Sequence, residues 1–126
     1  MLKNIFCCIV LELPSPTMTP TPQVWHEGGG GSLTCSSFTG DLSAGSLIFR
    51  WQKDGRDIFS RPGVIVIHNP TATMSILELK RLTAGDSGDY TCIASNRAGK
   101  TSVSADMVVY GLCSVKELDK NIYFRM

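Results

Sequence analysis

Hydrophobic and polar residues alternate along much of the chain, in short runs separated by turn residues. A period of two predicts β-strands with one buried face, because successive side chains of a strand point to opposite faces. The alternating runs cover residues 32–36, 47–52, 75–82, 89–95 and 102–110. Turn signals such as Asp54-Gly55 separate them. No stretch carries the period of an amphipathic helix, so the sequence predicts an all-β fold, an antiparallel sandwich or barrel.

Each run has apolar residues at alternate positions, and these predict the core. The expected inward residues are Leu33, Cys35, Leu47, Phe49, Trp51, Leu77, Leu79, Leu82, Tyr90, Cys92, Ala94, Val103, Ala105, Met107 and Val109. The run from Val64 to Ile67 differs, because every residue in it is apolar. It predicts a strand with apolar side chains on both faces.

The two ends of the chain lack this pattern. Residues 1–12 hold a short apolar run that resembles a stunted secretion signal without a cleavage site; an unstructured leader or a misjudged gene boundary is the alternative. Residues 13–22 contain four prolines and predict an extended linker or an edge strand. We therefore expect a leader and linker over 1–19, one domain over 20–111, and a tail outside the domain over 112–126.

Composition limits the possible functions. The chain has 126 residues, 43% hydrophobic residues and a formal net charge of +1, which fits one globular domain and does not favour nucleic acid as a partner. The sequence has no apolar run of about 18 residues, so it predicts no transmembrane helix. The two histidines lie far apart and outside any catalytic motif, and the run Gly28–Gly31 lacks the residues of a phosphate loop. The sequence thus predicts no enzyme, metal, cofactor or small-molecule substrate.

The cysteines indicate a structural cross-link instead of a metal site. The five cysteines form no CxxC pair. Cys35 and Cys92 lie in separate predicted strands, which favours a long-range disulfide and an oxidising compartment, with free buried thiols as the alternative. We expect Cys7, Cys8 and Cys113 to be unpaired.

Five further residues form a pattern with these two cysteines: Trp51, Leu82, Asp86, Gly88 and Tyr90. Trp51 is placed to pack against a disulfide between two sheets, and Tyr90 stands two residues before Cys92, at the position of a tyrosine corner. Leu82 and Asp86 precede that corner and are expected to be structural.

These residues carry a resemblance to the immunoglobulin superfamily. The segment DSGDYTCIASNRAGKTSVSA resembles the E–F corner and strands F and G of an intermediate-set immunoglobulin domain, and FRWQKDGRDI resembles strand C with its following turn. The phrases SNRAG and GDLSAGSLIFRWQKDG are similar to variable domains of the Dscam cell-adhesion family. The resemblance covers Pro20 to Gly111. It implies a Greek-key sandwich, one disulfide between the sheets, and an ion pair between Asp86 and Arg61.

Apolar residues on the solvent face mark a candidate partner surface. If Leu77 and Leu79 point inward, then Met74, Ile76 and Glu78 point outward. Either Val64 and Val66 or Ile65 and Ile67 must also face solvent. In the immunoglobulin fold both segments belong to neighbouring strands, D and E. Together they predict an exposed apolar patch of the kind that binds proteins, unless polar neighbours or another domain cover it.

The resemblance implies an extracellular recognition module of a membrane-anchored surface receptor. We expect its partner to be the same domain on an identical molecule, as in axon guidance and dendrite self-avoidance. The alternatives are a secreted or heterophilic domain that binds another protein or a microbial surface, and a structural spacer. Asn69-Pro70-Thr71 has the proline that forbids N-glycosylation.

Overall fold

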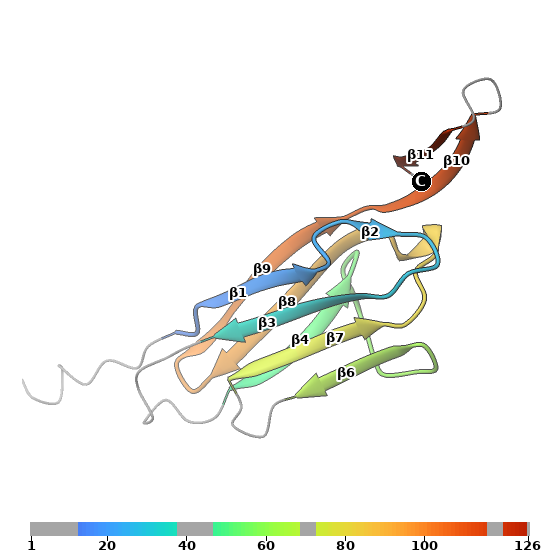
Figure 1. The fold of residues 1–126 in the computed structure, drawn as a ribbon. Coiled ribbons are helices and arrows are strands. Elements are labelled where there is room, and N and C mark those ends of the chain that lie inside the picture. The colour runs from blue at the N-terminus through green and yellow to red at the C-terminus, as the bar shows by residue number, and fades with distance from the viewer. Residues whose placement is uncertain (1–12, 38–46, 69–72, 116–119, 126) are drawn as a thin grey trace, which may run out of the picture.

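The computed structural model describes residues 13–37, 47–68, 73–115 and 120–125, and its fold is all-β (Figure 1). One sheet has the order β1-β3-β7-β6, and a second has the order β5-β4-β8-β9. All neighbours within these two sheets are antiparallel. The two sheets pack face to face, as the sequence predicts (Figure 1).

The strands of the two sheets range from two to nine residues in length. The first sheet consists of β1 (Pro16–Thr21), β3 (Gly31–Ser37), β6 (Val64–His68) and β7 (Met74–Leu79). The second sheet consists of β4 (Ile48–Lys53), β5 (Arg56–Asp57), β8 (Gly88–Asn96) and β9 (Gly99–Met107). A 3-10 turn, η4 (Ala84–Asp86), precedes β8.

The remaining strands form a third sheet, with the order β11-β10-β2. The strand β2 (Trp25–His26) runs parallel to the start of β10 (Val109–Val115). The strand β10 also pairs antiparallel with β11 (Lys120–Arg125), and this hairpin extends away from the sandwich (Figure 1). The expected tail over 112–126 therefore contains two paired strands.

The first strand begins before the expected domain boundary. β1 starts at Pro16 and pairs with β3 over six positions, so the boundary expected at residue 20 falls inside it. Prolines fit here because β1 lies at the edge of its sheet, where a missing N–H donor breaks no ladder on the open side. The expected leader over residues 1–12, with Cys7 and Cys8, lies outside the described residues, as does the Cys113 side chain.

A disulfide cross-links the two sheets. Cys35 on β3 and Cys92 on β8 are bonded, with their Cα atoms 6.4 Å apart and a sequence separation of 57. Closing a loop of this length stabilises the fold by about 4 kcal/mol in the chain-entropy model. The inward residues of both sheets fill the space around it. Those buried in the core include Leu33, Phe49, Trp51, Leu77, Leu79, Leu82, Tyr90 and Ala94.

Trp51 packs in this core, and the nitrogen of its indole ring has a hydrogen-bond partner. The indole Nε1–H donates a hydrogen bond to Ser75 Oγ at 2.8 Å, and Ser75 is fully buried on β7 of the opposite sheet. A buried donor and a buried acceptor therefore pair across the sandwich. Loss of either would leave the other unpaired in an apolar environment.

Trp25 is a core residue that the sequence pattern does not reveal. It is fully buried from β2, and its ring meets that of Tyr90 edge-on with centroids 5.6 Å apart. A Cβ on Gly31 would lie 2.7 Å from the Trp25 indole, so a side chain at position 31 would displace the ring. One member of the four-glycine run is thus explained by the close approach of an aromatic ring.

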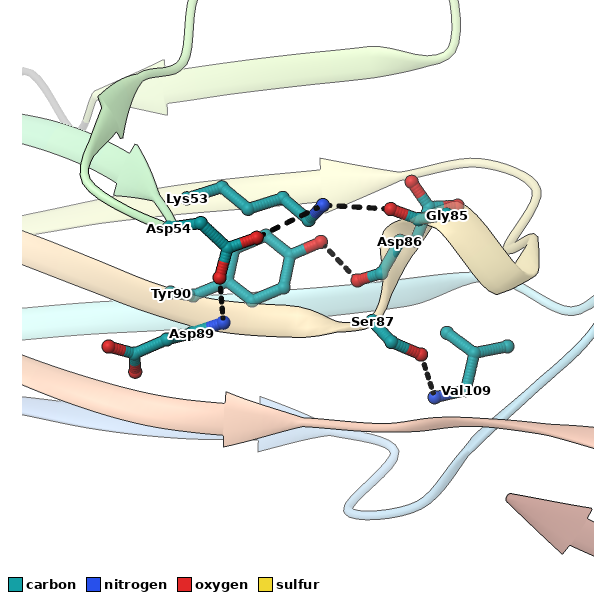
Figure 2. Close-up of polar contacts among 8 residues, drawn as sticks. All are labelled: Lys53, Asp54, Gly85, Asp86, Ser87, Asp89, Tyr90 and Val109. Atoms are coloured by element: carbon teal, nitrogen blue, oxygen red, sulfur yellow. Dashed lines mark hydrogen bonds and ion pairs between the residues drawn. The ribbon is translucent and has the colours of Figure 1, made fainter. Parts of the chain in front are cut away.

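A tyrosine corner closes one end of the sandwich (Figure 2). The Tyr90 hydroxyl donates to the Asp86 backbone oxygen at 2.5 Å. The Lys53 ammonium donates to the Gly85 carbonyl at 2.8 Å, and the Ser87 hydroxyl accepts from the Val109 N–H at 2.9 Å. These bonds tie η4 to β4, β8 and β10. Burial, and secondarily the Asp86 charge, raises the pKa of Tyr90 well above its usual range.

The ion pair expected between Asp86 and Arg61 is not formed. Among the described residues the ion pairs are Arg50 with Asp57 at 2.8 Å and Lys53 with Asp54 at 3.7 Å. The Asp86 carboxylate instead accepts hydrogen bonds from the Thr83 backbone N–H and hydroxyl. It caps its own turn, while Arg61 and Asp86 line the same pocket without meeting.

Replacing Ser75 with alanine should destabilise the domain by about 1–3 kcal/mol, because the buried Trp51 N–H loses its acceptor. Urea unfolding of the oxidised chain measures this loss. Ser102, exposed on β9, provides the matched control, and Ser102→Ala should change the free energy of unfolding by less than about 0.5 kcal/mol. Equal stabilities of the two variants would contradict the role of the Trp51–Ser75 bond.

Replacing Tyr90 with phenylalanine should alter how stability depends on pH above about pH 10, the usual pKa of an unfolded tyrosine. In that range the unfolded chain loses the phenol proton while the folded chain keeps it, so the unfolding free energy falls as pH rises. One such group contributes a slope of at most about 1.4 kcal/mol per pH unit. Tyr90→Phe should show a correspondingly shallower decline in denaturant titrations between pH 8 and 11. Parallel pH profiles for the two proteins would refute this assignment.

Candidate functional site

The structure decides which apolar pair of β6 faces solvent. Val64 is only 7% exposed and belongs to the core, and Val66 packs against that core. Ile65 is half-buried and Ile67 is 43% exposed on the opposite side of the strand. The outward pair is therefore Ile65 and Ile67. Val64 and Val66, both candidate partner-surface residues in the sequence, point into the sandwich.

The alternation in β7 follows the predicted orientation. Ser75, Leu77 and Leu79 are buried, and the positions between them are half-buried on the outer face. Met74, Ile76 and Glu78 occupy those outer positions. Three of the candidate surface residues thus lie on the face on which they were expected.

The strand register brings the outward residues of β6 and β7 together. Ile67 pairs with Ile76, and Ile65 pairs with Glu78. Residues directly opposite each other in neighbouring strands share a face and contact one another. Met74, Ile76, Ile65 and Ile67 therefore form one contiguous group, which we call the apolar strip.

Hydroxyl residues cover the other half of this face. β3 contributes Ser32, Thr34 and Ser36, of which Thr34 pairs with Ile76 and Ser32 with Glu78. β1 contributes Thr17, Thr19 and Thr21 at exposed positions. A shallow hollow of about 600 Å³ runs across the face near Glu78, between the apolar strip and these hydroxyls. The outer face is thus apolar along β6 and β7 and hydroxyl-rich along β1 and β3.

The sequence pattern missed the hydroxyl half of this face. Residues 13–22 predict a linker or an edge strand, and the edge strand is what forms over Pro16–Thr21. The available signal was the threonine at every second position of PTMTPT, which is the period of a strand. The prolines between the threonines weakened that signal, because proline is rare inside sheets.

The outer face of the second sheet has a different character. Arg50 donates to both carboxylate oxygens of Asp57, at 2.9 and 2.8 Å, and Gln52 donates to the same carboxylate at 3.1 Å. The Gln52 and Arg50 hydrogen bonds lower the pKa of Asp57 below its usual value. Ile48 is 63% exposed on this face.

Exposed apolar side chains also occur away from the apolar strip. Phe59 is 73% exposed between β5 and β6 and, like Ile48, stands apart from the apolar strip. Single exposed hydrophobic residues are ordinary on protein surfaces, whereas a contiguous group more often marks a contact site. The apolar strip is therefore the stronger candidate for a binding surface.

The described residues give no indication of a metal or membrane-spanning element. They contain no group of three histidine, cysteine or acidic side chains that could hold a metal ion. No helix within the same ranges has the length and apolar character needed to cross a bilayer.

Comparisons with known proteins agree with this architecture. In sequence, the chain is 42% identical over 60 residues to Hemicentin-1 of Mus musculus, covering 48% of this chain and 1% of that protein. It is 36% identical over 70 residues to Cell adhesion molecule DSCAML1 of Mus musculus, covering 54% of this chain and 3% of that protein. The chain therefore spans a small fraction of the length of these relatives.

The fold is also similar to a solved structure of the Dscam family. The N-terminal eight immunoglobulin domains of Down Syndrome Cell Adhesion Molecule superpose with a TM-score of 0.68 at 27% identity, over 79% of this chain and 12% of that one. The predicted resemblance to Dscam domains is confirmed, while the intermediate-set subdivision stays a prediction. A family model described as an immunoglobulin domain matches residues 14–96, well over half of the sequence. With its two antiparallel sheets, inter-sheet disulfide and tyrosine corner, this chain belongs to the immunoglobulin domain family.

Proposed function

We propose that this domain is a cell-adhesion module that recognises a second copy of itself through the outer face of the sheet β1-β3-β7-β6. The observation that carries the proposal is the apolar strip formed by Ile65, Ile67, Met74 and Ile76. It is contiguous across two strands and lies beside a surface rich in hydroxyl groups. An apolar centre with a polar rim is the usual anatomy of a protein interface.

A two-fold arrangement suits this face. In a two-fold interface the same patch meets itself, so its centre must tolerate its own copy. With the axis at Ile76 and the two β7 strands antiparallel, Ile76 would face the partner's Ile76. Met74 would then lie toward the partner's Glu78. The apolar strip would be buried without placing like charges in opposition at its centre.

A single interface of this kind should be weak, and repetition would strengthen it. The relatives are far longer than this chain, and the solved Dscam fragment contains eight immunoglobulin domains. Linked copies of a weak contact gain avidity because later binding events become intramolecular. Residues such as Glu78 would supply selectivity, since a partner with a carboxylate at position 74 would place two like charges in opposition.

The proposed setting is the extracellular part of a membrane-anchored, Dscam-like receptor. The disulfide supports an oxidising compartment. The name of the relative Cell adhesion molecule DSCAML1 supports a role in adhesion. Recognition between identical molecules would serve processes such as axon guidance and dendrite self-avoidance.

Replacing Ile76 with aspartate should abolish self-association of the oxidised 126-residue chain. The substitution opposes two carboxylates across the two-fold axis, and such like-charge contacts cost several kcal/mol, or at least about a hundredfold in affinity. Sedimentation velocity over a concentration series measures the effect. The wild type should show a rise in sedimentation coefficient with concentration that the variant lacks.

Ile48→Asp is the matched control, because it makes the same change at an exposed isoleucine on the opposite sheet. It should associate like the wild type. A wild-type chain that stays monomeric at every concentration would overturn the self-recognition proposal and favour heterophilic binding or a spacer role. Equal loss of association in both variants would show that the contact does not use the apolar strip.

A further inference from the structure

The edge strand β1 has the composition of a glycan-bearing segment. Residues 14–22 read PSPTMTPTP, in which hydroxyl residues alternate with four prolines and one methionine, Met18. Serine- and threonine-rich stretches with proline are typical of O-glycosylated regions. Such segments usually lie in stalks between domains, whereas here the threonines belong to a strand of the folded domain.

The structure presents these threonines to solvent in an extended conformation. β1 stands at the end of the sheet order and pairs with β3 on one side. Pro16, Met18 and Pro20 are half-buried, while Thr17, Thr19 and Thr21 are exposed. The side chains of these threonines are therefore accessible from solvent on an extended segment at the edge of the sheet.

The three threonines differ in how their hydroxyls are used. Thr17 Oγ1 lies 3.3 Å from Ser36 Oγ and 3.4 Å from the Ser36 carbonyl oxygen. Within the described residues, the hydroxyls of Thr19 and Thr21 make no such contact; only the Thr21 backbone oxygen accepts a bond, from Ser32. Each of these two threonines is followed directly by a proline, Pro20 or Pro22. Thr19 and Thr21 are therefore the freest acceptors on the strand.

We propose that Thr19 and Thr21 are sites of O-linked glycosylation. In the transfer, the threonine Oγ attacks the anomeric carbon of a sugar carried by a nucleoside diphosphate. The new Oγ–C1 bond forms as the bond between C1 and the phosphate oxygen breaks. The hydroxyl proton passes to a base of the transferase or to the departing phosphate, and the nucleoside diphosphate leaves. The Cys35–Cys92 disulfide fits a chain that folds in the oxidising compartments where such transfers occur.

A sugar at these positions would lie on the proposed recognition face. Thr19 pairs with Thr34, Thr34 with Ile76, and Ile76 with Ile67, so the four residues form one row across the sheet. At a strand spacing of about 4.8 Å, Thr19 and Ile76 lie about 10 Å apart on the same face. This step rests on the proposed function: a glycan on Thr19 would obstruct the approach of a second copy, so glycosylation would limit self-association.

The acceptor assignment is tested by secreting the full chain from cultured animal cells behind a foreign secretion signal. Glycopeptide mass spectrometry with electron-transfer fragmentation then locates the modification. We expect a hexose or N-acetylhexosamine on Thr19, Thr21 or both, and the mass of the modification tells these two classes of sugar apart. The double variant Thr19→Ala, Thr21→Ala should lack it, and Thr34 should stay unmodified as an internal control. Unmodified Thr19 and Thr21, or a phosphate in place of a sugar, would overturn the assignment.

The effect on association is measured separately. Sedimentation velocity compares the glycosylated chain with the double variant from the same cells, and the glycosylated form should associate at least about tenfold more weakly. Equal association would refute the regulatory step while leaving the acceptor sites standing. If neither protein associates, the self-recognition proposal and the regulatory step that rests on it fail, and the glycan assignment remains judged by mass spectrometry alone.

Discussion

The cross-link between Cys35 and Cys92 sets the spacing on which the rest of the structure depends. It joins β3 of one sheet to β8 of the other, and it lies beside Trp51, whose indole donates to Ser75 across the same gap. Both connections hold inner faces together. Because the alternation of a strand is strict, fixing which residues face inward also fixes which residues face outward. The character of the outer face is therefore a consequence of the core.

The most informative segment for function is the one that the alternation rule could not resolve. Val64 to Ile67 is apolar throughout, so periodicity alone leaves two orientations open. The choice is made by packing: Val64 and Val66 fill space beside the core, and Ile65 and Ile67 are left outside, opposite Glu78 and Ile76. A sequence can show that such a strand has a surplus of apolar residues. The register between this strand and the neighbouring strand β7 shows on which face the additional apolar residues lie.

The same distinction applies to other features: those that depend on residue type and spacing could be predicted, and those that depend on three-dimensional contacts could not. The disulfide, the buried Trp51 and the tyrosine corner of Tyr90 could be predicted, because each follows from residue type and spacing within strands. Trp25 could not be, because its two-residue strand carries no period and its burial depends on the missing side chain at Gly31. The prediction of an ion pair between Asp86 and Arg61 was wrong, because the Asp86 carboxylate accepts a hydrogen bond from a nearer donor, the Thr83 backbone N–H. Resemblance to a family supplies candidate partners for a side chain, but local competition for hydrogen bonds decides among them.

The edge strand connects the two inferences about this domain. A partly apolar sheet that ends in an exposed strand risks pairing with the strands of other chains. In β1 the prolines have no N–H to offer to a further strand, and the threonines give the exposed side a hydroxyl surface instead of an apolar one. The same sequence therefore discourages edge-to-edge pairing and would direct the proposed association toward the face of the sheet. Sugars on those hydroxyls would extend this protection from the edge onto the face. Control of the contact would then reside in a strand that contributes little apolar surface to the contact itself.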